Sequence, residues 1–150
     1  MPDLAFQDQL PGNHCWGCGP EVTTGLRLQS FWSHREGGLA VCDWKPRPEF
    51  AAGPQHIVYG GTLASIVDCH GIWTAIATAY LQADRPIGSE PRLWYATASL
   101  KVNYLLPTPI DESLHLEAIV TETSNRKSLV SCTLSAAGKT TVTADMVAVL

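Results

Sequence analysis

The stretch from Ile57 to Gln82, IVYGGTLASIVDCHGIWTAIATAYLQ, restricts the fold of this chain more than any other part of the sequence. A glycine pair, Gly60-Gly61, is followed by more than twenty apolar-rich residues without a proline. A proline-free run of this length is too long for a strand, so we predict a helix over about residues 61–82.

The segments on either side of this helix have the two-residue alternation of strands. Before it, residues 26–33 and 38–45 flank a glycine-containing turn and predict a hairpin. After it come four strand-like segments joined by short polar links: 93–107, 114–124, 127–138 and 139–150. Strands connected in this way pair antiparallel. The chain is therefore predicted to form one domain, residues 1–150, of the α+β class.

The predicted helix carries apolar side chains on all sides. Its large apolar residues do not fall on one stripe: Leu63, Ile66, Val67, Ile72, Trp73, Ile76 and Leu81. A helix of this kind is covered on every side. A curved sheet covers one side, and the sequence offers no second long helix for the other. We therefore expect a partner subunit, in a homodimer or a dimer of dimers.

Composition narrows the possible partners and the location. The net charge is −4 and the basic residues are scattered, which argues against nucleic acid. The N-terminus has neither the basic nor the apolar region of a secretory signal. Asp68 and His70 fall near the centre of the apolar stretch. In a membrane span they would lie in the bilayer centre, where ionisable side chains are energetically unfavourable. We predict a soluble cytoplasmic protein with no nucleic-acid or membrane partner.

The five cysteines have no disulfide-framework spacing and are predicted to be reduced. Cys15-x-x-Cys18 is half of a zinc motif, to which His14 could add a third ligand. A structural zinc site normally needs four ligands, usually as two spaced pairs, and no second pair follows. We therefore predict no metal, and small buried cysteines in a tight loop against Trp16. Cys69 is likewise interpreted as a small buried side chain.

Asp68 is the one carboxylate in the predicted helix. Buried carboxylates are rare unless they are paired or functional. Asp68 is too far from the helix start to cap it, and His70, two residues on, points elsewhere. A basic partner or a hydrogen bond to a Ser or Thr remains possible, but we favour a functional role.

The glycine pair stands at the other notable position, the helix N-terminus. Amide groups there lack intrahelical partners and lie at the positive end of the helix dipole. Glycines allow a ligand oxygen to approach them closely. A flexible turn with Thr62 as the helix cap explains the pair equally well.

The spacing of these two features has a consequence for assembly. Gly60 and Asp68 are eight positions apart, which is about 12 Å along a helix axis. Groups that act on one carbonyl must approach it to roughly 3 Å. If both act, Gly60 of one subunit faces Asp68 of a second subunit, with the two helices antiparallel. Small residues beside Asp68 permit such close approach: Ala64, Ser65, Gly71 and Ala75.

Three motifs resemble the PaaI-type acyl-CoA thioesterases of the hotdog-fold superfamily. They are NHCWGCGPEVTTGLRL (13–28), VYGGTLASIVDCHG (58–71) and Tyr104-Leu105-Leu106-Pro107. The resemblance runs from about residue 13 to the end of the chain. It implies an antiparallel sheet wrapped around one long central helix, and a dimer with two shared sites. It also implies hydrolysis of an acyl-CoA thioester without a cofactor, since coenzyme A belongs to the substrate.

The resemblance also implies roles for individual residues. The Gly60 N–H, adjacent to Gly61, would polarise the thioester carbonyl. Asp68 of the other subunit would act as general base on water or as nucleophile, and Thr97 would help to hold the water. The substrate-binding residues implied are Tyr59, Gly61, Gln55, His56, Ser99, Arg126 and Lys127.

Two positions depart from the family pattern. Tyr59 replaces the histidine before the glycine pair, and Gly53 replaces an asparagine, so that Gln55 or His56 would have to substitute. Arg126-Lys127 is suited to the phosphates of coenzyme A, although a charged pair at a hairpin is also typical of solvated surface.

Two alternatives to hydrolysis stay open. A hydratase or dehydratase acting on acyl thioesters usually needs an Asp–His pair, and Asp68 and His70 have the wrong spacing for one helix face. A non-catalytic acyl-CoA-binding protein is the other, because Tyr59 stands where the family has histidine.

Overall fold

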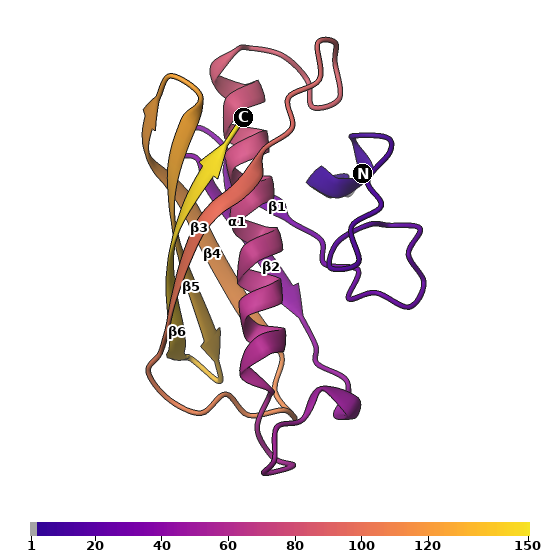
Figure 1. Ribbon diagram of the computed structural model, residues 1–150, viewed down its shortest axis with the longest axis vertical. Helices are drawn as coiled ribbons and strands as arrows, with labels where there is room; N and C mark the ends of the chain where they lie inside the picture. The colour runs from indigo at the N-terminus through magenta and orange to yellow at the C-terminus, as the bar shows by residue number, and fades with distance from the viewer. Residues whose placement is uncertain (1–2) are drawn as a thin grey trace.

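The computed structural model describes residues 3–150 and consists of one long helix packed against one antiparallel sheet (Figure 1). The helix, α1, spans Gly60–Gln82. The strands are β1 (Phe31–His34), β2 (Leu39–Trp44), β3 (Ala96–Tyr104), β4 (Leu114–Ser124), β5 (Lys127–Ala136) and β6 (Lys139–Val149). Their order in the sheet is β1-β2-β4-β5-β6-β3. This arrangement confirms the predicted α+β class with one central helix.

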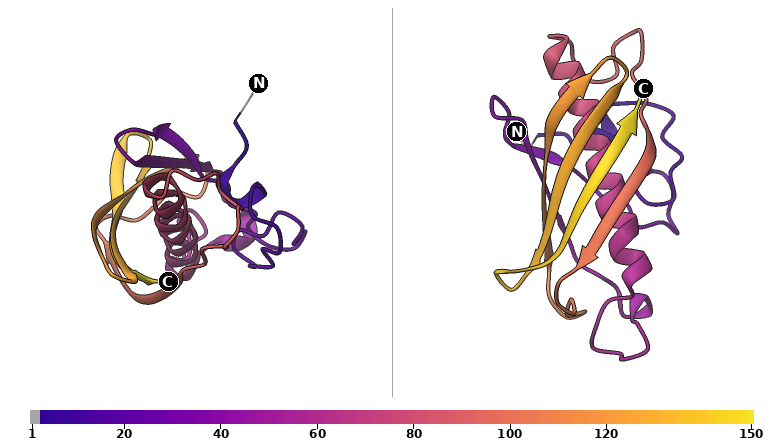
Figure 2. Two further views of the ribbon diagram at one scale, coloured as in Figure 1. Left: turned by 90° about the horizontal axis from the view of Figure 1, so that it is seen from above. Right: turned by 60° about the vertical axis from the view of Figure 1, so that its left-hand side comes forward.

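The sheet curves around one side of α1. Figure 2 shows this in the view from above, where the N-terminal segment lies on the opposite side of the helix. Alternate residues of β5 face the helix, so that Val130, Cys132 and Leu134 are buried. From α1, large side chains such as Trp73 and Ile76 complete the core.

One stripe of α1 is left open in the single chain. Its members recur every three or four residues and are only partly buried: Gly61, Ala64, Ser65, Asp68 and Ile72. Residues three and four apart share a helix face, so this stripe is continuous. The sheet and the N-terminal segment thus cover the helix on all but this narrow side.

The predicted strands agree with the sheet except in the first hairpin and at the ends of β3, which was predicted over residues 93–107 and spans Ala96–Tyr104. Strand character was predicted for residues 26–33, but β1 begins only at Phe31. The backbone N–H groups of Leu26 and Leu28 instead donate to the carbonyls of Trp16 and Gly17. The alternation in this segment correctly indicated which side chains are buried, since Leu26 and Leu28 are in the core. The backbone of the segment, however, pairs with the N-terminal loop and not with a strand.

Among the described residues, α1 included, no helix combines the length and the hydropathy that crossing a bilayer requires.

Candidate active site

The clearest polar contact on the open stripe of α1 joins Asp68 to β3. The Thr97 hydroxyl donates a hydrogen bond of 2.5 Å to Asp68 Oδ1. The sequence suggested a buried carboxylate, but in the single chain Asp68 is only partly buried, because it lies on that open stripe. Among the described residues, none bonds its second carboxylate oxygen, which is left for another group.

A β-bulge turns Thr97 toward the helix. In β3, the partly buried residues Leu100 and Val102 pack against the core, so regular alternation would point Thr97 to the other face. The pairing of β3 with β6 shifts register between Thr97 and Ser99. The extra residue, Ala98, resets the alternation and aims Thr97 at α1. Ser99, next to Leu100, faces the opposite side of the sheet and does not join this group.

Two tyrosines frame the start of α1. The Tyr104 hydroxyl, at the far end of β3 from Thr97, donates a 2.8 Å hydrogen bond to the Gly60 carbonyl. The Tyr59 ring lies against Gly61, where an added Cβ would be 2.4 Å from Tyr59 Cε1. Within residues 3–150, neither the Gly60 nor the Gly61 N–H donates a hydrogen bond. The helix start therefore presents two available donors, partly screened by Tyr59.

The other predicted binding residues lie in two groups. Gln55 and His56 are exposed in the turn that leads into α1, close in sequence to the glycine pair. Arg126 lies in the turn before β5 and Lys127 begins that strand, at the level of Thr97. In the sheet, β6 separates β5 from β3. Two strand spacings amount to roughly 10 Å. Arg126 Nη2 also donates to the Leu150 carbonyl at 2.8 Å.

Within one chain, therefore, the predicted residues form two separate sets. One set surrounds the glycine pair, and the other lies around Asp68 and Thr97. The helix rise keeps Gly60 and Asp68 about 12 Å apart. The single chain does not bring them to one reacting atom.

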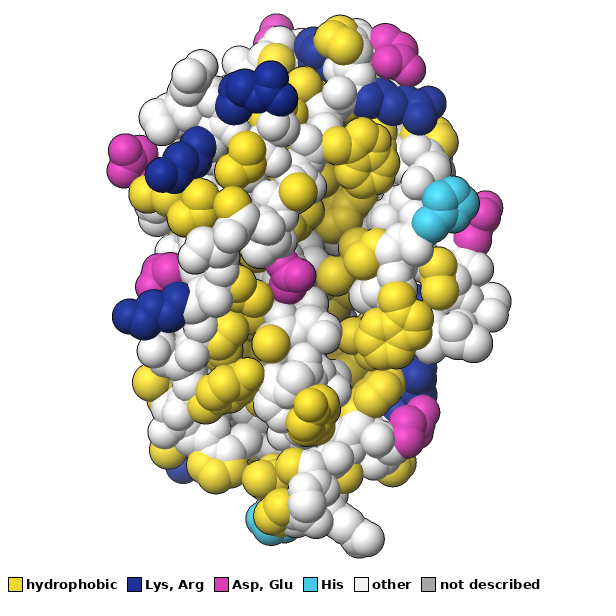
Figure 3. Space-filling view, viewed as in Figure 1, with side chains coloured by type: hydrophobic (Ala, Val, Ile, Leu, Met, Phe, Trp, Pro, Cys, Tyr) yellow, Lys and Arg dark blue, Asp and Glu magenta, His cyan; other side chains and the backbone are white. Residues whose placement is uncertain are grey.

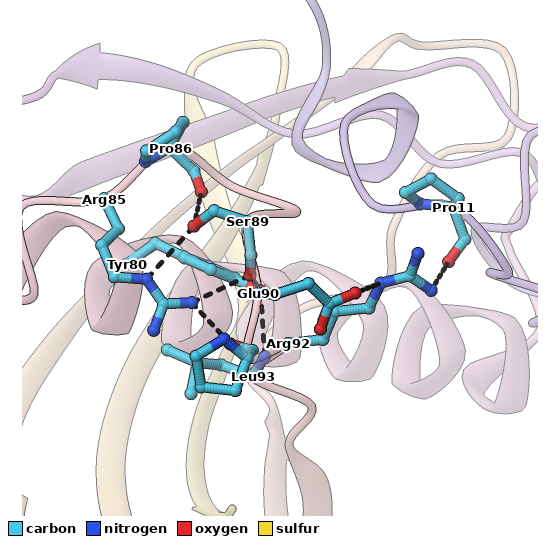
Figure 4. Close-up of polar contacts among 9 residues, drawn as sticks. Pro11, Tyr80, Arg85, Pro86, Ser89, Glu90, Arg92 and Leu93 are labelled. Carbon is cyan, nitrogen blue, oxygen red and sulfur yellow. Dashed lines mark hydrogen bonds and ion pairs between the residues drawn. The ribbon is translucent and has the colours of Figure 1, made fainter.

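A cavity of about 580 Å³ lies away from both sets, beside the C-terminal end of α1. Its lining includes Phe6, Trp32, Tyr80 and Arg85. Figure 4 shows that Arg85 is already engaged, because its guanidinium donates to Ser89 Oγ and to the Ser89 and Pro91 carbonyls. These bonds tie the Arg85 side chain to the loop after α1 through two of its three guanidinium nitrogens.

His70 is a core histidine. Its side chain is fully buried, with Nδ1 2.8 Å from Ser30 Oγ and Nε2 3.2 Å from the Ala40 carbonyl. Burial lowers its pKa from the usual 6.5 to about 4. The imidazole is thus neutral and directed away from Asp68.

The structure also brings three cysteines together next to this site. The Sγ atoms of Cys15, Cys18 and Cys69 all lie within 4.8 Å of one another. A hydrogen bond from the Cys69 thiol lowers the pKa of Cys15 to about 5 and also lowers that of Cys18, while the pKa of Cys69 itself is raised.

The expected environment of this loop was wrong in two respects. Cys15 is exposed rather than buried, and Trp73, not Trp16, contacts Cys18. The reason is the direction of the loop, which turns its thiols toward α1 and leaves the Trp16 side chain 51% exposed. Spacing along the sequence could not have grouped Cys69 with the other two, because it comes from α1.

Comparisons with solved structures find the same fold in bacterial proteins. A thioesterase superfamily protein from Shewanella loihica PV-4 is 31% identical, with a TM-score of 0.68 over 92% of this chain and 94% of that one. A phenylacetic acid degradation-related protein from Ralstonia eutropha JMP134 is 22% identical, with a TM-score of 0.74 over 97% and 99% of the two chains. The PaaI protein from the phenylacetic acid degradation operon of E. coli is 15% identical, with a TM-score of 0.61 over 75% and 72%. No family model and no curated protein matches the chain.

Proposed function

This chain belongs to the thioesterase superfamily of hotdog-fold proteins, and on that premise we propose that it hydrolyses an acyl-CoA thioester. The observation that carries the proposal is the Asp68–Thr97 pair on an otherwise uncharged helix stripe. A carboxylate held by a hydroxyl donor, with one oxygen left over, is suited to activating water.

In the proposed reaction, the N–H of Gly60 donates to the thioester oxygen, with Gly61 adjacent. Donors fixed at a helix start stabilise the negative charge that develops on this oxygen. Water, deprotonated by Asp68, forms the new C–O bond, and the C–S bond breaks. The thiolate of coenzyme A leaves and takes up a proton, so the products are a carboxylic acid and the free thiol.

Asp68 has a second possible role, as a nucleophile that forms a mixed anhydride with the acyl group. A single turnover in oxygen-isotope-labelled water detects an anhydride that water opens at the Asp68 carbonyl. Direct attack by water labels the carboxylic acid product in that first turnover. Hydrolysis of an anhydride at the Asp68 carbonyl leaves the label on the protein instead.

We propose that the site is shared between two chains. The two sets of residues are about 12 Å apart in one chain, so Gly60 of one copy must serve Asp68 of another in an antiparallel arrangement. The open stripe of small residues on α1 allows close approach. Exposed apolar side chains lie near the helix start, including Tyr59, Leu105 and Leu106. In Figure 3, the face over α1 carries hydrophobic patches, and most charged side chains lie at its rim.

The same arrangement suggests how coenzyme A binds. Arg126 and Lys127, at the Thr97 end of the sheet, supply the positive charge that its phosphates require. Gln55, His56 and Tyr59, at the other set, flank the acyl end of the substrate. The Tyr59 phenol donates a hydrogen bond where the family uses histidine.

The test is hydrolysis of short, long and aryl acyl-CoA thioesters, followed as free thiol, by the parent and by Asp68→Asn. We expect the variant to lose roughly 10²- to 10⁴-fold in kcat/KM, as for removal of a general base, while its oligomeric state is unchanged. Equal rates for the two proteins on every thioester would overturn the assignment.

One observation favours a second candidate, a non-catalytic acyl-CoA-binding protein. The Tyr59 ring lies over Gly61 and partly screens the amide donors that catalysis needs. Tight binding of acyl-CoA without turnover on any acyl group would support this candidate. A hydratase finds no such support, because the His70 imidazole is bonded to Ser30 and Ala40.

A further inference from the structure

The three-cysteine cluster joins two parts of the chain that are distant in sequence. Cys15 and Cys18 lie in the N-terminal loop, and Cys69 lies on α1, directly after Asp68. The Cys15 and Cys69 Sγ atoms are 3.8 Å apart, and all three sulfurs lie within 4.8 Å of one another. A tetrahedral ion with metal–sulfur distances of about 2.3 Å holds its sulfurs about 3.8 Å apart. The cluster is therefore close to ligand geometry.

The loop is shaped so that its two thiols converge on the third. The Gly19 N–H donates to the Cys15 carbonyl at 2.7 Å, and the Cys15 N–H donates to Asn13 Oδ1 at 3.1 Å. Gly17, between the two cysteines, packs directly against the helix thiol, since an added Cβ there would be 2.4 Å from Cys69 Sγ. This close approach is possible only for glycine.

Polar hydrogens support the cluster from outside. The indole N–H of Trp73 donates to Cys18 Sγ at 3.2 Å. The side-chain amide of Asn13 approaches the same sulfur at 3.6 Å. N–H groups directed at a sulfur favour the thiolate that metals bind, and such outer partners orient the ligands of metal sites.

We propose that Cys15, Cys18 and Cys69 bind one thiophilic divalent cation, Zn²⁺, whose fourth ligand is a water molecule on the exposed side of Cys15. Thiolate ligands select soft or borderline metals over Mg²⁺ and Ca²⁺. Each thiol releases its proton as it binds. The ion links the N-terminal loop to α1 beside Asp68.

The sequence alone predicts no metal, because Cys15-x-x-Cys18 lacks a second pair, and His14 is its possible third ligand. His14 is exposed and is not part of the cluster. Cys69 takes that place. The proposal is independent of thioester hydrolysis, because it rests on the cluster alone.

The test uses the full chain, fully reduced, freed of metal with a chelator, and titrated with Co²⁺ in the absence of oxygen. We expect a sulfur-to-cobalt charge-transfer band and the visible bands of tetrahedral cobalt, saturating at one ion per chain. Zn²⁺ should displace the cobalt and abolish the charge-transfer band and the visible bands. Thiol titration of the folded zinc form should find Cys15, the exposed cysteine of the cluster, protected and should recover it when the chelator is added.

Two variants and one control identify the ligands. Loss of a residue that only hydrogen-bonds to a metal ligand weakens metal binding roughly 10–100-fold. Cys15→Ser, at an exposed position, and Cys69→Ser each remove a ligand itself, so each should weaken Zn²⁺ binding by at least this factor. Cys132→Ala is the matched control, because this buried cysteine lies on β5 outside the cluster. Its cobalt spectrum should equal that of the parent. Circular dichroism verifies that each variant is folded.

Three results would overturn the proposal. The first is a reduced parent protein that develops no thiolate-to-cobalt band. The second is an unchanged band in folded Cys15→Ser and Cys69→Ser. The third is a Cys15–Cys69 disulfide that forms in air in a protein that takes up no metal after reduction, which would make the cluster a redox pair instead.

Discussion

The Thr97 hydroxyl reaches Asp68 at 2.5 Å only because a β-bulge reverses the direction of its side chain. The bulge thus places the hydroxyl that holds the Asp68 carboxylate. An edge strand provides this freedom, since β3 pairs with β6 on one side only.

Replacing Thr97 with valine keeps the shape of the side chain and removes the donor to Asp68. A hydrogen bond to a charged group contributes about 1.5–3 kcal/mol, so we expect kcat/KM to fall roughly 10- to 100-fold. Acyl-CoA hydrolysis by the purified variant measures this. Thr123→Val, at an exposed position of β4, is the control and should keep the parent rate. An unchanged rate in Thr97→Val would remove this residue from the mechanism.

Adding a methyl group at Gly61 should act through Tyr59. The new Cβ would lie 2.4 Å from Tyr59 Cε1, so the ring must move away. We expect Gly61→Ala to change kcat/KM less in a Tyr59→Ala background than in the parent, because the clash is then absent. A double-mutant cycle measures this coupling. Strict additivity of the two changes would show that Tyr59 does not transmit the effect.

Subunit mixing tests the shared site. Asp68→Asn keeps its glycine pair, whereas Gly60→Trp keeps its Asp68 but blocks the helix start. Each should be inactive alone. After the two are unfolded together and refolded, a mixed dimer contains one complete site, so part of the activity should return. Activity that stays absent, with mixed dimers verified by mass spectrometry of differently tagged chains, would refute the shared site.

Acid should destabilise the fold through His70. Its folded-state pKa of about 4 lies below the usual 6.5, so between these values the unfolded chain binds a proton that the folded chain does not. His70 therefore has no effect on the pH dependence of the free energy of unfolding at neutral pH, but it lowers that free energy as the pH drops from 6.5 to 4. The shift in the His70 pKa corresponds to a loss of about 3 kcal/mol.

Urea unfolding of the chelator-treated protein across this pH range measures the effect. His70→Asn is less stable at every pH, because Ser30 and Ala40 lose their partner, but its stability should depend less on pH. The same dependence of unfolding free energy on pH in His70→Asn as in the parent would contradict the role given to His70.

His115 should act in the opposite direction. Its hydrogen bond to Asp43 raises its pKa, so the stability that this residue contributes is lost as pH rises.

The elements that depend on local pattern were predictable from the sequence. The helix was expected over about residues 61–82 and spans Gly60–Gln82, since no proline interrupts it. The strand at 114–124 has the predicted bounds, because polar turns delimit it on both sides. In residues 26–30, by contrast, alternation reported which side chains are buried but not which backbone they pair with.

The candidate site was predictable only in part. Asp68 stood out as an isolated acid, and the family resemblance added Thr97. The bulge that directs Thr97 inward, and leaves Ser99 on the other face, has no signal in the sequence. The grouping of Cys69 with Cys15 and Cys18 depends on how the N-terminal loop folds over α1, which only the tertiary structure reveals.

The contact between Gly17 and Cys69 also restricts how this protein can change over evolutionary time. A side chain at position 17 would displace the thiol at position 69, so neither residue can drift without regard to the other. Homologues that keep the helix cysteine should keep the loop glycine. Homologues with a larger residue at 17 should have lost the cysteine, and this covariation would record the cluster in sequences whose structures have never been solved.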